Sequence, residues 1–478
     1  MLRAERSIFI VAWDIDGRIT LPRHGADDSA PEQFRDFIDY LARRRPKLTI
    51  YVLLWDYSIL YAGGRQPLPT ITIDWSTPKN VRLVLDDRVP LGGSHHQKIV
   101  SVDDTLAFVG GIDLTRHRWD TPDHTPEDPR RVDHEGKPYP PFHDVQLVVD
   151  GPAARAVAEL CHWRWEQSTG ETLELATVPA APWPEDLPPS WCSVAVGIAR
   201  TLPTEQERPG TREILELYTE SIAAAQHSIY IENQYLAADP IAEALAVRLT
   251  ETDGPEVVIV TQWATSTWLE EQVMGVRRGQ FIARLQEADE HGRLRILAPT
   301  VPGLSKEDYY LHSKIAVVDD CLVQIGSANL NNRSLGYDSE CNLAIECQNE
   351  QERAAACSFR NRLLAEHLGE DPDTVQTEIE RCGSLVAAID ELRGREGRSL
   401  AELDSPEAVP RPLEAVAELG DPEKPLMSHA WFEKALPEKA RISDQNPNFR
   451  LKALLAAFIV LVSLIAIWSL LDFFETFV

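Results

Sequence analysis

HQKIVSVDDTLAFVGGIDL, which begins at His96, aligns without a gap with HSKIAVVDDCLVQIGSANL, which begins at His312. The same order continues upstream, where RSIFIVAWDI from Arg6 resembles HSIYIENQYL from His227. Alternating apolar residues in these stretches predict β-strands, and stretches with helical periodicity lie between them. A repeated unit of strand, helix, strand and hairpin indicates a duplicated chain. We therefore predict an α/β fold with two similar α/β lobes.

Composition divides the 478 residues into five segments. This length exceeds one ordinary hydrophobic core, so two packed lobes are expected. The proline-rich stretch between the repeats is typical of a linker, and the stretch rich in Pro, Glu and Ala after the second repeat is typical of a stalk. The predicted boundaries are 1–169 for the first lobe, 170–190 for the linker, 191–398 for the second lobe with its trailing helices, 399–450 for the stalk and 453–471 for a transmembrane helix.

The segment from Ala453 to Leu471 contains 19 residues and no charge. As a helix it would be about 28 Å long, close to the thickness of the bilayer hydrocarbon core. Arg450 and Lys452 precede it, whereas Asp472 follows it. The positive-inside rule then predicts a single-pass anchor in the cytoplasmic membrane with the catalytic part in the cytoplasm. A buried core helix is the alternative, but such helices seldom lack a polar face over so many turns.

The two repeats differ in what precedes their first strand. A helical stretch at 211–226 comes before the strand of the second repeat, but only Met1 to Arg6 come before the matching strand of the first. We therefore expect the native protein to start upstream of Met1. The intact mass of the native protein tests this expectation, and a mass that matches Met1 contradicts it.

Each repeat carries the pattern HxKxxxxD, and chance would place two copies in only about one chain in a thousand of this length. Strand alternation puts the histidine and lysine of each motif on one face, whereas the aspartate has the opposite parity and falls in an Asp-Asp pair at a turn. We assign the chemistry to histidine and lysine and interpret the aspartates as turn-stabilising members of the motif. The motif residues are His96, Lys98 and Asp103 in the first repeat, and His312, Lys314 and Asp319 in the second.

Two such motifs facing each other supply the groups that phosphodiester cleavage requires. One imidazole attacks phosphorus, the other protonates the leaving oxygen, and the two lysines hold the non-bridging oxygens. Each imidazole also needs an orienting acceptor on its other nitrogen. Asp144 in FHDVQLVV and Glu340 in DSECNLAI are the candidates. The residues alone do not rank the two histidines as nucleophile and acid.

Both motifs and the residues that follow them resemble those of the phospholipase D superfamily. IYIENQYL and PFHDVQLVVDGPAARAVA are similar to blocks of its eukaryotic-like, phosphatidylcholine-hydrolysing branch, and the similarity covers about Arg6 to Gly369. The resemblance implies a bilobal α-β-α-β-α sandwich with the active site at the lobe interface, a phosphohistidine intermediate, and no required metal or other cofactor. It also implies that His96 is the nucleophile and His312 the acid and base. The C-terminal anchor would make the chain similar to membrane-anchored bacterial members.

The resemblance further implies phosphate contacts after each motif. Asn329 resembles the family's substrate-contacting asparagine, whose amide can donate a hydrogen bond to a phosphoryl oxygen. Asp113 occupies the matching position in the first repeat, where an ionised carboxylate cannot donate, so we expect an asymmetric site. The predicted phosphate-binding residues are Asn329, Ser327, Asp113 and Gly111.

Charge and metal-ligand spacing argue against two other classes of site. The chain has 47 Lys and Arg against 75 Asp and Glu, a net charge of −28, which disfavours nucleic acid as a partner. Its seven cysteines form no CxxC pair. The histidines of the loop after the first motif, His117, His124, His134 and His143, fit no compact zinc-ligand spacing, so we predict no metal site.

The expected function is cleavage of the headgroup of phosphatidylcholine or phosphatidylethanolamine to give phosphatidic acid, with water or an alcohol as acceptor. A phosphatidyl transferase such as a cardiolipin synthase is the first alternative, although the paired N-terminal membrane helices usual in those enzymes are not seen. A catalytically silent, membrane-anchored binding protein is the second. It is disfavoured because neither motif has lost a residue. The oligomeric state is left open.

Overall fold

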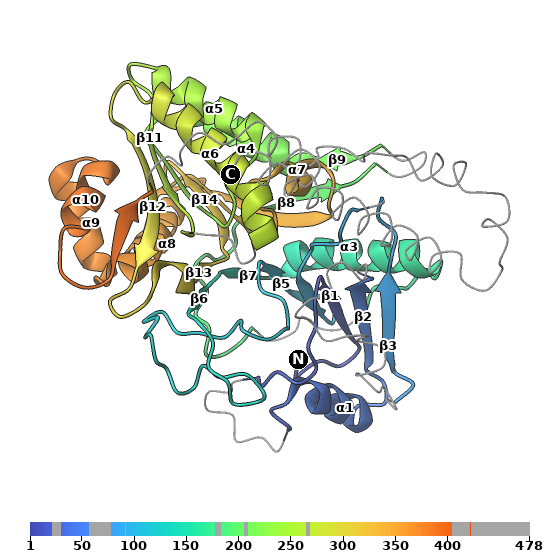
Figure 1. The fold of residues 1–478 in the computed structure, drawn as a ribbon. Helices are drawn as coiled ribbons and strands as arrows, with labels where there is room; N and C mark the ends of the chain where they lie inside the picture. Colours follow the sequence, from blue (N-terminus) through green and yellow to red (C-terminus); the bar gives the residue numbers. More distant parts are fainter. Residues whose placement is uncertain are drawn as a thin grey trace, which may run out of the picture. The chain divides into compact units, whose positions relative to one another are not determined.

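The structure is a computed structural model, which describes residues 1–21, 30–56, 78–90, 92–176, 183–204, 209–263 and 268–403, together with Asp421. These residues form a six-stranded sheet and a nine-stranded sheet with helices packed on their faces (Figure 1). Each sheet contains one copy of the repeat. The prediction of an α/β fold built from a duplicated unit is therefore confirmed at the level of its elements.

The first sheet has the strand order β3-β2-β1-β4-β5-β7. All six residues of β1 are buried, as expected for a central strand covered on both faces. The hairpin β4–β5, which carries the first motif's aspartate at its turn, joins β1 in antiparallel orientation. The elements of this half are β1 (Ser7–Ala12), α1 (Phe34–Arg44), β2 (Thr49–Trp55), β3 (Val81–Asp86), β4 (Ile99–Val102), β5 (Leu106–Gly110), β6 (Phe142–His143), β7 (Gln146–Asp150) and α3 (Gly151–Thr169).

The second sheet has the order β17-β12-β11-β10-β14-β15-β16-β8-β9. Its elements up to the second motif are β8 (Val196–Leu202), β9 (Thr211–Arg212), α4 (Glu213–Ala224), β10 (Ser228–Asn233), α5 (Asp239–Thr250), β11 (Glu256–Val260), α6 (Trp268–Ala288), β12 (Leu294–Thr300) and β13 (Tyr310–Leu311). The remaining elements are β14 (Lys314–Val318), β15 (Leu322–Gly326), α7 (Asn332–Gly336), β16 (Glu340–Glu346), α8 (Glu350–Leu368), α9 (Pro372–Cys382), α10 (Leu385–Leu392) and β17 (Ser399–Glu402).

Strand pairing repeats between the halves. In the first sheet β1 pairs in parallel with β2 and antiparallel with β4, which places Ile10 opposite Val100. In the second sheet β10 pairs in parallel with β11 and antiparallel with β14, which places Ile231 opposite Ala316. Each motif hairpin is therefore held at the same place beside the first strand of its own repeat.

Helices separate and cover the two sheets. α1 packs on one face of the first sheet, and α4, α5 and α6 pack on one face of the second. α3 packs between the sheets, where its Trp165 shares a hydrophobic cluster with Phe9 of the first sheet and Leu343 of the second. α8 follows the last strand of the second repeat as α3 follows that of the first, and each helix ends at a glycine with positive φ, Gly170 and Gly369.

The motif aspartates stabilise the turn and also anchor the neighbouring strand. Asp103 and Asp319 adopt φ values of 52° and 53°, in the left-handed region that turns use. The Asp103 carboxylate accepts hydrogen bonds from the backbone N–H groups of residues 5–7 at 2.7 to 2.9 Å. The Asp319 carboxylate accepts from those of residues 226–228 at 2.6 to 2.8 Å. Each carboxylate thus holds the beginning of β1 or β10 against the motif hairpin, which agrees with the structural role predicted for it.

Replacing Asp319 with alanine is expected to lower the free energy of unfolding by about 2 kcal/mol, because three backbone donors lose a charged acceptor. Turnover per folded molecule should stay within about twofold of the parent, since the carboxylate contacts backbone rather than the motif histidine or lysine. Urea denaturation and a steady-state assay of the same preparation check both numbers. Asp253→Ala, at an exposed turn, is the matched control. A hundredfold loss of turnover with unchanged stability would make Asp319 a participant in the chemistry.

The C-terminal boundaries predicted for the stalk and the transmembrane helix can be compared with the structure only in part. The second sheet continues to Glu402, because β17 pairs with β12 at its edge, so the segment predicted to be stalk from residue 399 contributes a strand to the fold. The predicted transmembrane helix at 453–471 lies outside the described residues, as does most of the predicted stalk. In the described ranges, no helix has both the length and the apolar content that crossing a bilayer requires.

Candidate active site

The two motifs approach each other because each is tied by its backbone to the other half of the chain. The amide of His96 donates to the carbonyl of Ser339 at 2.9 Å, just before β16 of the second sheet. The amide of His312 donates to the carbonyl of His143 at 2.8 Å, where β13 pairs in parallel with β6. Strand pairing across the lobes therefore places both histidines at one interface.

Each histidine receives its carboxylate from the opposite half. Nδ1 of His96 lies 2.9 and 3.0 Å from the two carboxylate oxygens of Glu340, and Nδ1 of His312 lies 2.7 Å from Oδ2 of Asp144. Both carboxylate side chains are fully buried, whereas the histidines remain 14% and 9% exposed. This geometry orients each ring and leaves its Nε2 as the nitrogen that a substrate can reach. The structure thus brings both predicted orienting residues to the histidines. The carboxylate of each half contacts the histidine of the other half, and we call this the exchanged pairing.

The two motif lysines are buried beside the histidines. Nζ of Lys98 donates to the carbonyl of His96 at 2.8 Å, and Nζ of Lys314 donates to the carbonyl of His312. Burial lowers the pKa of Lys314 to about 7. Each lysine is thus held by the carbonyl of its own motif histidine, and its positive charge can attract an anion such as a phosphate diester.

The site is asymmetric around these lysines. Oδ2 of Asp113 lies 3.3 Å from Nζ of Lys98, and its other oxygen accepts from the backbone N–H of Trp13 at 3.0 Å. Asn329, at the matching place in the second half, is 5% exposed, and its Oδ1 has no hydrogen-bond partner among the residues that the structure describes. Asp113 therefore offsets the charge of one lysine, whereas Asn329 is neutral and has an unpaired carbonyl oxygen in the described part of the site. The two halves thus differ at this position, while the phosphate contacts predicted for Asp113 and Asn329 stay predictions.

Ser327 and Gly111, two of the predicted phosphate-binding residues, lie against the orienting carboxylates. The hydroxyl of Ser327 donates to Oε2 of Glu340, so it orients the carboxylate that orients His96. A Cβ at Gly111 would lie 2.5 Å from both oxygens of Asp144, so only glycine leaves room for that carboxylate. The two residues occupy equivalent positions. Both contact the orienting carboxylates, and the phosphate contacts predicted for them stay predictions.

Three further side chains at the site were not predicted. The ring of Trp13 lies edge-on to His96, with centroids 5.8 Å apart, and Nζ of Lys98 lies 5.5 Å from the Trp13 ring. Gln234, in the corresponding segment of the second half, accepts from Nζ of Lys314 at 3.3 Å. The guanidinium of Arg118 lies over Phe142, which contacts His312. Arg118 adds a third positive charge near the second motif, and the RHR sequence after the first motif was its only signal.

Burial shifts the pKa of each motif histidine and of the carboxylate that it contacts. Burial, together with the lysines, holds the pKa of His96 and His312 well below the usual value of histidine. Burial raises the pKa of Asp144 to about 7 and that of Glu340 to about 7. The physical cause is the same for all four groups, since a dry site disfavours every charged form. Burial therefore favours the uncharged form of both members of each pair.

A network of buried histidines and carboxylates contacts the second motif at Ser313. His143 lies between Glu366 and Glu232, with 2.7 Å to each, and Ser313 donates to Glu232 at 2.6 Å. Glu232 accepts from two more donors, Tyr230 and His367, so all of its lone-pair positions are used. The group offers nitrogen and oxygen ligands within metal-binding distance, but its donors already saturate it. It is therefore best explained as an ion network that fixes the backbone on both sides of His312 and Asp144.

Both halves of the chain match family models of known proteins. Residues 79–187 match the family model described as "Phospholipase D", and residues 218–362 match the model described as "Cardiolipin synthase, PLD-like domain". Among curated proteins, phospholipase D A of Dictyostelium discoideum is 26% identical over 450 residues, which cover 77% of this chain and 34% of that protein. Phospholipase D alpha 3 of Arabidopsis thaliana is 23% identical over 539 residues, which cover 82% of this chain and 65% of that protein. The chain thus spans between a third and two thirds of these relatives.

Among solved structures, phosphatidylserine synthase of Haemophilus influenzae Rd KW20 is similar with a TM-score of 0.48 and 13% identity. The similarity covers 81% of this chain and 89% of that one. The two family matches fall one in each half of the chain, and each includes one HxKxxxxD motif.

Proposed function

We propose that this protein, which belongs to the phospholipase D superfamily, hydrolyses the phosphodiester bond of membrane glycerophospholipids to give phosphatidic acid and a free headgroup alcohol. The exchanged pairing of His96 with Glu340 and of His312 with Asp144 carries the proposal. It places two oriented imidazoles and two buried lysines in one site, which is the minimum set for two-step transfer of a phosphoryl group. Relatives whose names include phospholipase D support the reaction class.

The first step forms a covalent intermediate. Nε2 of His96 attacks phosphorus with its lone pair while the bond from phosphorus to the headgroup oxygen breaks. That oxygen takes a proton from Nε2 of His312 and leaves as a neutral alcohol. Lys98 and Lys314 stabilise the charge that accumulates on the non-bridging oxygens. The assignment of His96 as nucleophile follows the family resemblance, since the geometry around the two histidines is closely matched.

The second step reverses these roles with a new acceptor. Water gives a proton to Nε2 of His312 and its oxygen attacks phosphorus, so the bond between phosphorus and His96 breaks and phosphatidic acid leaves. A primary alcohol in place of water would give a phosphatidyl alcohol. Glu340 and Asp144 keep each ring in the tautomer and orientation that both steps use.

The membrane location completes the proposal. An anchor formed by residues 453–471, with the catalytic part on the cytoplasmic side, would keep the site beside its lipid substrate despite the net charge of −28. Tethering acts by raising the effective concentration of the site at the bilayer. Fractionation of cells that express the full chain and a chain ending at residue 452 would test the anchor separately from the chemistry.

Product analysis tests the reaction. Incubation of the purified protein with labelled phosphatidylcholine and a primary alcohol is expected to give both phosphatidic acid and the phosphatidyl alcohol, because both acceptors compete for one intermediate. Their ratio should follow the alcohol concentration while total turnover changes little. Release of the headgroup with its phosphate still attached would contradict the mechanism. A ratio of phosphatidic acid to phosphatidyl alcohol that does not depend on the alcohol concentration would also contradict it.

The lowered pKa of Lys314 predicts that kcat/KM depends on pH near neutrality. Because burial lowers the pKa of Lys314 to about 7, its ammonium group in the free enzyme loses its proton as the pH rises through neutrality. We therefore expect kcat/KM to fall above about pH 7. Lys314→Arg keeps its charge at all accessible pH values and should move the alkaline limb upward by at least about one pH unit, whatever its absolute activity. If the alkaline limb of kcat/KM stays at the same pH in Lys314→Arg, a group other than Lys314 causes the loss of activity.

One observation favours a second candidate function. The family model that matches residues 218–362 is described as a cardiolipin synthase domain, so transfer of a phosphatidyl group to a lipid alcohol is the alternative. The same intermediate would then be captured by a glycerol hydroxyl of phosphatidylglycerol. Supplying phosphatidylglycerol as the sole lipid separates the two functions, because only the transferase yields a lipid with two phosphates.

A further inference from the structure

The two copies of the repeat differ at one buried position beside the motif hairpin. Glu232 of β10 aligns with Val11 of β1 when HSIYIENQYL is set against RSIFIVAWDI. Both side chains are buried, Glu232 completely and Val11 to 2% exposure. Burial of a carboxylate costs several kcal/mol of desolvation, which its donors must offset, whereas burial of a valine favours folding. The second half therefore carries a costly group at a position that the first half fills with an apolar side chain.

Glu232 joins the two partners of the second pair, His312 and Asp144. Its Oε2 accepts from the hydroxyl of Ser313 at 2.6 Å and lies 2.7 Å from Nε2 of His143. Ser313 directly follows His312 in the chain, and His143 directly precedes Asp144. One carboxylate oxygen thus holds the residue beside the acid and base histidine and the residue beside the carboxylate that orients it.

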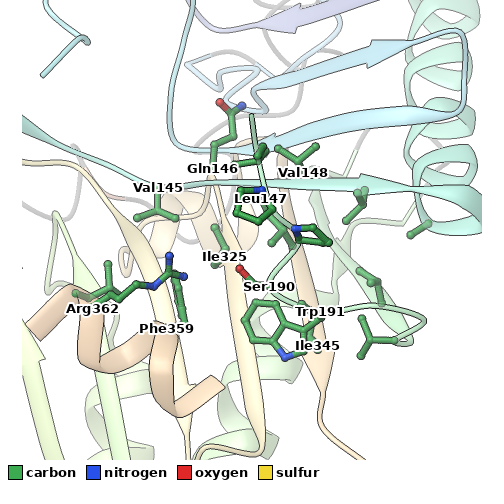
Figure 2. A pocket seen from close by; sticks show the side chains of 18 of the residues that line it. Val145, Gln146, Leu147, Val148, Ser190, Trp191, Ile325, Ile345, Phe359 and Arg362 are labelled. Atoms are coloured by element: carbon green, nitrogen blue, oxygen red, sulfur yellow. The ribbon is translucent and has the colours of Figure 1, made fainter. Parts of the chain in front are cut away.

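The residue on the other side of Asp144 cannot replace this contact. Val145 and Leu147 face a groove between β7 and α8 (Figure 2). The side chain of a valine makes no hydrogen bond, so His143 is the neighbour of Asp144 that has a polar side-chain contact. His143 is itself fixed at its second nitrogen, because Nδ1 lies 2.7 Å from Oε1 of Glu366 on α8. The side-chain anchor of this segment is therefore His143.

The first pair, His96 and Glu340, is held by a different set of side chains. Gln97 directly follows His96, and its Nε2 donates to the carbonyl of Glu340 at 3.1 Å. Arg164 of α3 donates to Oε1 of Gln97 at 2.6 Å and to Oδ2 of Asp86, at the end of β3, at 2.5 Å. In the part of the chain that the structure describes, no hydrogen bond joins these buried residues to the network behind the second motif. The two pairs are therefore supported separately.

We propose that Glu232 is a positioning residue for proton transfer, which holds His312 and Asp144 in the alignment that protonation of the leaving oxygen requires. This role rests on the proposed function, in which His312 is the acid and base. An acid and base must meet the leaving oxygen and then the attacking water with the same nitrogen. A buried carboxylate that the other half of a duplicated chain replaces with Val11 is expected where function, rather than folding alone, requires it.

The leaving group separates this role from a general structural one. The oxygen of choline needs a proton as it leaves phosphorus, whereas p-nitrophenolate leaves as a stable anion. Single-turnover release, with enzyme in excess over lipid, measures the first step alone. Glu232→Gln is expected to slow release of choline from phosphatidylcholine by about 10²-fold, the loss typical of a displaced catalytic group. Release of nitrophenolate from phosphatidyl-p-nitrophenol should stay within about threefold of the parent rate, because it needs no general acid.

Two variants of the same kind are the matched controls. Asp86→Asn changes a buried carboxylate behind the first motif and should slow both leaving groups by one common factor of about ten, since both require the nucleophile. Glu256→Gln changes a carboxylate that accepts from Ser384 and from the start of α10, and it should leave both rates unchanged. Loss of folded protein would lower the amplitude of release for both substrates and leave the rate constants as they are.

Ser313→Ala tests the same contact if Glu232→Gln does not fold. It keeps the carboxylate with its other donors and removes the hydrogen bond beside His312. Release of choline should slow by about tenfold, the size expected for one hydrogen bond to a charged group, with release of nitrophenolate unchanged. Equal slowing of both leaving groups in Glu232→Gln or in Ser313→Ala would overturn the proposal.

Proton NMR tests the positioning without turnover. The proton between Nδ1 of His312 and Asp144 should give a downfield resonance, as should the one between His96 and Glu340, and single His→Asn variants assign them. Glu232→Gln should shift the resonance of His312 and leave that of His96 in place. This result in a protein that hydrolyses no lipid would reject the proposed function and keep the positioning of His312. Lipid hydrolysis together with an unshifted His312 resonance would do the reverse.

Discussion

Replacing His96 with asparagine is expected to lower kcat by at least about 10⁴-fold, because the proposed reaction loses its nucleophile. His312→Asn should have an effect of similar size, since the leaving alkoxide then has no proton donor. The double variant should be no worse than either single variant by more than about tenfold, because the two imidazoles act as one unit. Initial rates of headgroup release from phosphatidylcholine vesicles measure all three.

His291→Asn is the matched control, because His291 is an exposed turn residue outside both motifs. It should retain the parent rate. Losses that multiply in the double variant would indicate two independent sites, one for each motif. The same result would contradict the exchanged pairing in which each half completes the other.

The orienting carboxylates should give the second largest effect. Asp144→Asn is expected to lower kcat by about 10² to 10⁴-fold, because an amide can stabilise the wrong tautomer of His312 and cannot balance the imidazolium. Glu340→Gln should act in the same way on His96. KM should change less than kcat, since neither side chain is placed to touch the phosphate. Steady-state kinetics over a range of lipid concentrations separate the two parameters.

A second histidine and aspartate pair provides the control. Oδ2 of Asp133 lies 3.8 Å from Nε2 of His117, in the loop after the first motif. Asp133→Asn makes the same chemical change away from the site and should leave kcat unaltered. If Asp144→Asn kept more than a tenth of the parent rate, His312 would not depend on this carboxylate.

The repeat and its elements could be predicted because they depend on local patterns. Period-2 alternation and the gapless match from His96 and His312 are properties of neighbouring residues, and they located the strands and hairpins that the structure contains. The turn role of Asp103 and Asp319 followed from the same parity. What the pattern could not show is that each carboxylate also accepts from three backbone amides where a strand begins, nearly a hundred residues away.

The exchange of carboxylates could not be predicted because it is a property of the interface. Asp144 and Glu340 were identified as orienting residues, but His96 and Glu340 are separated by 244 residues and lie in different halves. Only the pairing of segments across the lobes decides which histidine meets which carboxylate. The same limit explains Ser327 and Gly111, whose positions after the motifs indicated phosphate contacts although their nearest partners are the orienting carboxylates.

The buried ion network was missed for a related reason. The spacing of His124 and His143 along the loop fits no ligand set, and their partners Glu232 and Glu366 come from β10 and α8 of the other half. A search by local spacing cannot find a cluster assembled from three distant segments. Glu232 within IYIENQYL was visible only as part of a predicted strand.

The most direct test of the account is the stoichiometry of the covalent intermediate. Acid-sensitive label from phospholipid carrying ³²P should be trapped by rapid denaturation at no more than one phosphate per chain, on the peptide that contains His96. His312→Asn should still form this adduct if the leaving group is an activated one, and should release it slowly because deprotonation of water is lost. Label divided equally between the His96 and His312 peptides, or approaching two per chain, would contradict a single site built from both motifs.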